Sequence, residues 1–170
     1  MIYWFTGQPG SGKTVLANLL KEKYLPHAYR IDGDEMRELF TNKDYSIKGR
    51  ITNVDAAQKI AHYLHNQGKD VIVSLVSPYL DQREEFKDIM EWQLQEIFVH
   101  YDIEKGFRGR ENYHVMQFQK PDLDYIDIDT TNQTPEESLK IIAKKAGLDV
   151  IYPKGSLLNE LPPSDYQLDN

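Results

Sequence analysis

The hydrophobic residues of the chain fall into short runs that alternate with amphipathic stretches. The pattern predicts five strands, at 2–5, 29–32, 71–75, 97–101 and 125–129. The run at 71–75 is continuously apolar, which is typical of a central strand buried on both faces. The run at 2–5 consists of β-branched and aromatic residues, which also favour a buried strand.

Helical spacing of apolar residues separates these runs. After the first strand, apolar residues recur along one helical face at Val15, Leu16, Leu19 and Leu20. Further helices are predicted at 34–40, 52–67 and 80–89. A capping box at 134–137, with proline at the first helical position, predicts a last helix that runs to about residue 146. Alternating strands and helices predict an α/β fold of three layers, with helices flanking a mostly parallel five-stranded sheet.

The same pattern predicts how the chain is organised. Residues 1–148 contain no linker that would divide them, so we expect one domain there. Within it, the stretch at about 104–121 has no strong period and carries glycines and arginines, and we interpret it as a mobile lid. Residues 149–170 are rich in proline and are predicted to form an irregular C-terminal tail.

Composition excludes several classes of function. The 170 residues include no cysteine, which rules out thiolate metal sites and cysteine nucleophiles. The net charge is −7 without a dense basic run, so nucleic acid is not an expected partner. No apolar stretch approaches the roughly 20 residues of a membrane span, and the first ten residues do not resemble a signal peptide. We expect a cytoplasmic protein that binds small nucleotides, with a homodimer as one open alternative.

A phosphate-binding motif follows the first predicted strand. The pattern G-x-x-x-x-G-K-[ST] is matched in full by Gly7, Gln8, Pro9, Gly10, Ser11, Gly12, Lys13 and Thr14. Glycines allow the backbone amides to approach phosphates closely, and the following helix adds its positive N-terminal dipole. Lys13 is expected to reach the β- and γ-phosphates of ATP, and Thr14 to offer its hydroxyl to Mg²⁺. The motif predicts that the α/β fold is that of a P-loop NTPase.

Two carboxylates come at the end of the second predicted strand. Asp32 and Asp34 flank a glycine, at the edge of the sheet where ligands of open α/β folds bind. One could hold Mg²⁺, for which we favour Asp32, while the other accepts the proton of an attacking hydroxyl. The alternative is an ordinary Asp-Gly turn with a helix cap at Asp34. The P-loop upstream favours the catalytic interpretation.

Several arginines are candidates for anion binding. Arg37 lies one turn after Asp34, and Arg50 lies with Asn53 near the start of a predicted helix. An arginine fork binds phosphate or sulfate with two parallel hydrogen bonds. In the lid, Arg108 and Arg110 could neutralise charge that develops during transfer, so we include them with the ATP-binding residues. The alternative is that these arginines are solvated surface residues.

Taken together, these motifs resemble the adenylylsulfate (APS) kinase family. The resemblance rests on the P-loop, on 31–37, on the segment 45–53 and on the Ser-Pro-Tyr motif at 77–79. It covers about residues 1–103 and returns at 126–131. It implies ATP and Mg²⁺ as cofactors, and transfer of the γ-phosphoryl group to the 3′-hydroxyl of adenylyl sulfate.

The resemblance also implies roles for individual residues. Asp34 would be the base at the 3′-hydroxyl, with Asp32 as the second candidate. The phosphosulfate would be held by Arg37, Arg50 and Asn53.

The remaining implied contacts concern the acceptor. Tyr45 would take the place of the family's phenylalanine near the purine, and Phe118 is the candidate for the lid phenylalanine that stacks on the base. The Ser-Pro-Tyr motif of Ser77, Pro78 and Tyr79 would position the substrate. We expect Ser77 to act by positioning rather than by covalent catalysis.

The chain departs from the family pattern in two places. Its lid is shorter and lacks the family's arginine-aspartate pair and lysine-glycine-leucine-tyrosine run. The family also has a pair of arginines after the asparagine, whereas the equivalent segment of this chain, residues 54–57, contains no arginine. A second hypothesis is therefore a kinase of the same fold that phosphorylates another nucleoside, nucleotide, modified base or small alcohol.

A third hypothesis is a nucleotide-dependent switch or hydrolase. The chain has neither an aspartate-x-x-glycine motif after a strand nor the asparagine-lysine-x-aspartate motif for guanine. The sequence therefore favours a kinase over a switch.

Overall fold

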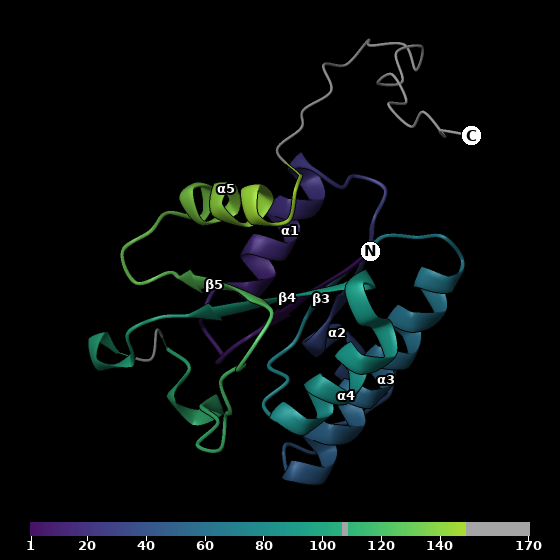
Figure 1. The fold of residues 1–170 in the computed structure, drawn as a ribbon. Coiled ribbons are helices and arrows are strands. Elements are labelled where there is room, and N and C mark those ends of the chain that lie inside the picture. Colours follow the sequence, from purple (N-terminus) through teal and green to yellow (C-terminus); the bar gives the residue numbers. More distant parts are fainter. Residues whose placement is uncertain (107–108, 149–170) are drawn as a thin grey trace, which may run out of the picture.

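Five strands lie side by side in one parallel sheet, in the order β2-β3-β1-β4-β5 (Figure 1). Their bounds are β1 (Ile2–Thr6), β2 (Tyr29–Asp32), β3 (Val71–Ser74), β4 (Leu94–His100) and β5 (Tyr125–Asp129). This is a computed structural model, and it describes residues 1–106 and 109–148. The predicted tail at 149–170 and Arg108 lie outside the described residues.

Helices cover both faces of the sheet. One face carries α1 (Lys13–Lys23) and α5 (Pro135–Lys145), and the other carries α2 (Gly33–Leu39), α3 (Ile47–Asn66) and α4 (Leu80–Met90) (Figure 1). Because side chains alternate along a strand, β1 sends Tyr3 and Phe5 into one apolar core and Ile2 and Trp4 into the other. The predicted three-layer P-loop fold is confirmed.

Helix α3 begins five residues earlier than the sequence predicts. Its N-cap is Ser46, whose hydroxyl oxygen accepts a hydrogen bond from the Gly49 amide at 3.2 Å. Gly49 is a poor helix former, but a Cβ at this position would lie 2.2 Å from the carbonyl oxygen of Asp44. Close packing of the loop before the helix therefore requires glycine in its first turn.

Strand β4 also begins earlier than predicted, because it includes a buried carboxylate. Glu96 is 1% exposed and faces α4. Its two oxygens lie 2.7 Å from Arg83 Nε and 2.5 Å from Lys87 Nζ. Burial alone would lower the pKa of Lys87, but contacts with Glu84 and Glu96 raise it above its ordinary value. We call Arg83, Lys87 and Glu96 the buried ion cluster.

The predicted lid connects β4 to β5 with little regular structure. It contains two short 3₁₀ helices, η2 (Ile103–Lys105) and η3 (Glu111–Tyr113). In the part of the chain that the structure describes, no helix combines the length and apolar character needed to cross a bilayer.

The buried ion cluster predicts a strong dependence of stability on Glu96. Glu96→Gln leaves two cationic groups without their buried counter-ion and should lower the free energy of unfolding by about 3–5 kcal/mol. Glu84→Gln is the matched control, since Glu84 pairs with the same Lys87 but is 40% exposed. Its expected cost is below about 1 kcal/mol. Urea denaturation measures both, and equal losses would contradict the assignment.

Candidate active site

A cavity of about 860 Å³ opens where β1, β2 and β3 end. Its walls come from the P-loop, from the segments after β2 and β3, from the start of α3 and from the lid. Both its position at the carboxyl ends of parallel strands and its size are typical of ligand sites in α/β proteins. The structure thus brings most of the sequence-predicted residues into one site.

The P-loop lies directly against the neighbouring strand. Gly7 has φ +145°, and a Cβ there would lie 2.0 Å from the carbonyl oxygen of Val99 in β4. Gly12, the N-cap of α1, has φ +99°, in the left-handed region that favours glycine. Both glycines are therefore required by the backbone path of the loop.

The side chain of Lys13 is buried against the P-loop. Its Nζ donates hydrogen bonds to the carbonyl oxygen of Gln8 at 2.8 Å and to Ser11 Oγ at 3.4 Å. Burial lowers the pKa of Lys13 to about 8, and Arg110 adds to the effect, while Asp32 and Asp34 oppose it. Among residues 1–106 and 109–148, no carboxylate forms an ion pair with the Lys13 ammonium, and phosphates could supply that partner.

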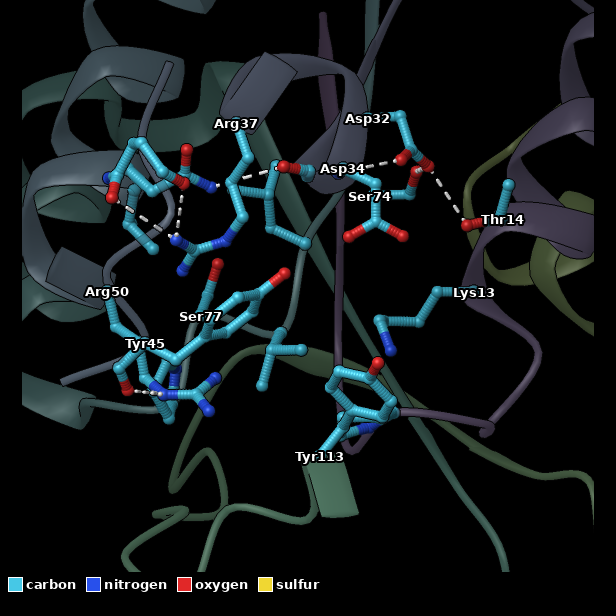
Figure 2. A pocket seen from close by; sticks show the side chains of 18 of the residues that line it. Lys13, Thr14, Asp32, Asp34, Arg37, Tyr45, Arg50, Ser74, Ser77 and Tyr113 are labelled. Atoms are coloured by element: carbon cyan, nitrogen blue, oxygen red, sulfur yellow. Dashed lines mark hydrogen bonds between the residues drawn. The ribbon is translucent and has the colours of Figure 1, made fainter. Parts of the chain in front are cut away.

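The Asp32 carboxylate accepts several hydrogen bonds at the edge of the cavity. Its oxygens accept hydrogen bonds from Thr14 Oγ1 (2.9 Å), Ser74 Oγ (2.8 Å) and the Asp34 amide (3.0 Å), and Arg30 lies 3.2 Å away (Figure 2). Burial favours the neutral acid, but these hydrogen bonds and Arg30 keep the pKa of Asp32 below its ordinary value. Asp32 is therefore ionised and poorly suited to accept a proton.

Asp34 lies on the first turn of α2, and its carboxylate points into the cavity between Lys13 and Arg37 (Figure 2). Within residues 1–106 and 109–148, its oxygens accept no hydrogen bond, unlike those of Asp32. A carboxylate that is accessible and accepts no hydrogen bond from the protein can accept a proton from a ligand. The geometry therefore separates the two carboxylates into a structural one and a free one.

Cationic and aromatic side chains meet at the far end of the cavity. Arg37 lies over the Tyr45 ring at 4.2 Å and Arg50 at 5.6 Å, and Arg50 Nε donates to the Tyr45 carbonyl oxygen at 2.9 Å. Asn53 is buried here, and its Oδ1 has no hydrogen-bond partner among the described residues. An unpaired buried acceptor is costly unless a ligand donates to it.

Part of the Ser-Pro-Tyr motif reaches the cavity. Ser77 and Pro78 line it, whereas Tyr79 is the N-cap residue of α4 and does not. Ser77 is 1% exposed, and its Oγ accepts a hydrogen bond from Trp4 Nε1 at 3.1 Å. This contact holds the hydroxyl against β1.

Four other predicted residues do not line the cavity, namely Gly7, Gln8, Ser11 and Phe118. Phe118 does not line the cavity, and its ring stacks on Phe98 of β4, with centroids 5.8 Å apart. Gln8 turns its side chain toward Val115 at the end of the lid. Arg110, in contrast, does line the cavity.

Sequence reasoning missed two residues of the site. Ser74 ends β3 and donates to Asp32, and its place at the carboxyl end of a buried parallel strand could have identified it. Tyr113 reaches the cavity from the lid and faces Tyr45, with ring centroids 6.2 Å apart (Figure 2). No periodicity in the lid points to Tyr113.

The pKa of Lys13 predicts a proton change on nucleotide binding. Phosphates stabilise the ammonium and raise its pKa from about 8, so Mg-saturated ADP should take up roughly half a proton at pH 8 and roughly a tenth at pH 7. Calorimetry in buffers of different ionisation enthalpy measures the uptake. Uptake that is the same at both pH values would contradict the assignment to Lys13.

Comparison with known proteins identifies the family. The model of the family described as adenylylsulphate kinase matches residues 1–112. The chain is 31% identical over 166 residues to cytidine diphosphoramidate kinase of Campylobacter jejuni, covering 86% of this chain and 96% of that enzyme. It is 30% identical over 158 residues to the bifunctional enzyme NodQ of Rhizobium sp. (strain N33), covering 85% of this chain but only 24% of NodQ.

Solved structures agree on the fold. The APS kinase of Mycobacterium tuberculosis, in complex with AMPPNP and APS, superposes with a TM-score of 0.73 at 22% identity. The match covers 86% of this chain and 96% of that one. The family resemblance of the motifs is confirmed. The chain belongs to the adenylylsulphate kinase family, and it is an ATP-dependent kinase that phosphorylates an alcohol acceptor.

Proposed function

We propose that the enzyme transfers the γ-phosphoryl group of ATP to a ribose hydroxyl of a nucleotide whose 5′ end carries a small anion. Adenylyl sulfate is the first candidate, with 3′-phosphoadenylyl sulfate as the product. The observation that carries the proposal is one cavity that joins the P-loop, the free Asp34 carboxylate and the pair Arg37 and Arg50. The P-loop, a candidate base and two candidate anion-binding side chains thus line the same cavity.

The P-loop is proposed to bind ATP. Its amides and Lys13 would hold the phosphates, and Arg110 would approach them from the lid. Thr14 and Asp32 would hold Mg²⁺, since they offer hard oxygen ligands 2.9 Å apart. Mg²⁺ typically takes only one or two protein ligands and completes its shell with water and phosphate oxygens. When bound, it would neutralise charge on the transferring group.

The transfer step assigns the base to Asp34. The acceptor hydroxyl oxygen forms a bond to the γ-phosphorus, while the bond between that phosphorus and the β–γ bridging oxygen breaks. The hydroxyl proton moves to the Asp34 carboxylate, and ADP leaves. Lys13 is suited to stabilise the negative charge on the phosphates, because its ammonium lies beneath the P-loop.

The acceptor would occupy the far end of the cavity. Arg37 and Arg50 present two guanidinium groups to its anionic end. Tyr45 and Tyr113 offer aromatic surfaces for its base, one from the start of α3 and the other from the lid. Asn53 Oδ1 could accept a hydrogen bond from a hydroxyl or N–H group of the acceptor.

Cytidine diphosphoramidate is the second candidate acceptor. It is favoured by the similarity to the Campylobacter jejuni enzyme, which spans almost that whole protein and extends beyond the family match at residues 1–112. The two candidates share a nucleotide with a tetrahedral terminal group. They differ in the base, and a terminal phosphoramidate carries N–H donors that a sulfate lacks.

The acceptor is tested by ADP release from Mg·ATP with each compound, and mass spectrometry identifies the product. Turnover with adenylyl sulfate alone supports the first candidate, and turnover with cytidine diphosphoramidate alone supports the second. No turnover with either compound, while ATP still binds, would refute the proposed acceptor class.

Asp34→Asn should lower kcat by roughly a hundredfold to ten-thousandfold, because the amide cannot accept the hydroxyl proton. Binding of an unreactive ATP analogue should change by less than about threefold, since Asp34 lies on the acceptor side of the transferred group. Rapid-quench kinetics and calorimetry measure the two quantities. A kcat close to that of the wild type would eliminate Asp34 as the base.

Tyr113→Ala should raise the acceptor KM about tenfold through loss of a stacking surface. The KM for ATP should stay within about twofold. Tyr63→Ala is the matched control, because Tyr63 is 64% exposed on α3 and does not line the cavity. An equal effect of both substitutions would argue against a contact between Tyr113 and the acceptor.

A further inference from the structure

Arg83 is a buried cation outside the cavity, yet its guanidinium contacts three separate segments. Nη1 donates to the Ser77 carbonyl oxygen at 2.6 Å and Nη2 to the Gln119 carbonyl oxygen at 2.7 Å. Nε lies 2.7 Å from Glu96 in β4. A planar guanidinium fixes the directions of its donors, so the carbonyl oxygens of Ser77 and Gln119 are held in one relative arrangement. The contact with Glu96 is an ion pair without hydrogen-bond geometry.

The first segment is the acceptor loop, residues 74–78, which lines the cavity. Its backbone is strained at Ser77, where φ is +43° in a residue other than glycine. Such a conformation persists only where the surroundings hold it in place. Besides Arg83, the Thr6 hydroxyl donates to the Ser77 carbonyl oxygen at 3.3 Å, and Trp4 donates to its Oγ.

The second segment is the lid stem, residues 115–119, which returns from the lid toward β5. The Gln119 amide donates to the Pro78 carbonyl oxygen at 2.8 Å, and the Leu80 amide donates to Gln119 Oε1 at 2.8 Å. The other end of the stem is held by Gln8. Gln8 Nε2 donates a hydrogen bond to the Val115 carbonyl oxygen at 2.8 Å, and Gln8 Oε1 accepts one from the Val115 backbone amide at 3.0 Å.

The lid stem therefore connects the P-loop to the acceptor loop. Its Val115 end is tied to Gln8, whose carbonyl oxygen accepts from the catalytic Lys13. Its Gln119 end is tied to the acceptor loop through Arg83 and through Pro78. The hydrogen bonds at both ends of the lid stem are buried or partly buried. A hydrogen bond is stronger in such surroundings than in water.

We propose that Arg83 is a positioning residue, which holds the acceptor loop and the lid stem together so that the acceptor side of the cavity keeps its shape. This inference rests on the proposed function, because it assigns the acceptor to that side. Arg83 does not line the cavity and touches no reacting group. Its effect on the reaction is through Ser77 and the lid stem.

Arg83→Lys tests the proposal, because lysine keeps a cation near Glu96 but loses the fork that reaches both carbonyl oxygens. The acceptor KM should rise about tenfold, while the KM for ATP should change by less than about twofold. Lys87→Met is the matched control. It removes the other cation of the buried ion cluster, and Lys87 contacts neither Ser77 nor Gln119. Its acceptor KM should stay within about twofold of the wild type.

A second readout does not depend on the identity of the acceptor. Hydrogen exchange of the Leu80 and Gln119 amides should become faster in Arg83→Lys and stay unchanged in Lys87→Met. The double variant R83M/E96Q removes the charge of both partners, which limits the cost of an unpaired buried ion. The double variant should show the same faster exchange of the Leu80 and Gln119 amides as Arg83→Lys. Thermal denaturation establishes that each variant is folded.

The outcomes separate the two proposals. If the wild type turns over neither acceptor, the proposed function fails, and the exchange data still decide the role of Arg83. Faster exchange in Arg83→Lys alone supports the positioning role. Unchanged exchange in Arg83→Lys, or equal changes in the acceptor KM for Arg83→Lys and Lys87→Met, would overturn it.

Discussion

The carboxylate of Asp32 holds together the elements that form the active site. It accepts hydrogen bonds from α1 through Thr14, from β3 through Ser74 and from the first turn of α2 through the Asp34 amide. These three donors come from segments far apart in the sequence. Because the same contacts stabilise the ionised form, the group that orders the site also carries a constant negative charge beside the phosphate loop. Its neighbour Asp34, whose amide it holds, lies on the first turn of α2 and lines the cavity.

The nucleotide side of the site could be predicted from the sequence because it is local. The P-loop occupies eight consecutive residues, and its steric requirements, such as the close approach of Gly7 to Val99, are met by residue types at fixed spacing. Asp32 and Asp34 follow the same logic, since the carboxyl ends of adjacent parallel strands meet at one edge. The motifs predict Asp34 as the base and Asp32 as the Mg²⁺ ligand. The hydrogen bonds that distinguish the two carboxylates could not be predicted, because one of them comes from Ser74, which is 42 residues away from Asp32.

The end of the cavity that we propose for the acceptor could be predicted only in part, because it is assembled from four segments. Arg37, Arg50 and Asn53 were predicted by motif, and they line the cavity. Phe118, the predicted lid aromatic, does not line it, whereas Tyr113 of the lid does and faces Tyr45. The lid has no period, so only its path in space decides which ring reaches the cavity. The buried ion cluster was missed for a related reason. A glutamate is not expected at a buried strand position. Glu96 is tolerated there because its carboxylate is paired with Arg83 and Lys87.

The hydrogen bond between Trp4 and Ser77 gives the enzyme an intrinsic optical reporter. The chain has two tryptophans, and their environments are opposite: Trp4 is 2% exposed and bonded to the acceptor loop, whereas Trp92 is 76% exposed. A water-soluble quencher removes the emission of Trp92 and leaves that of Trp4. The residual fluorescence therefore comes from Trp4, which contacts both Ser77 and Phe86, so a change in the surroundings of this side chain can be followed without attaching a label.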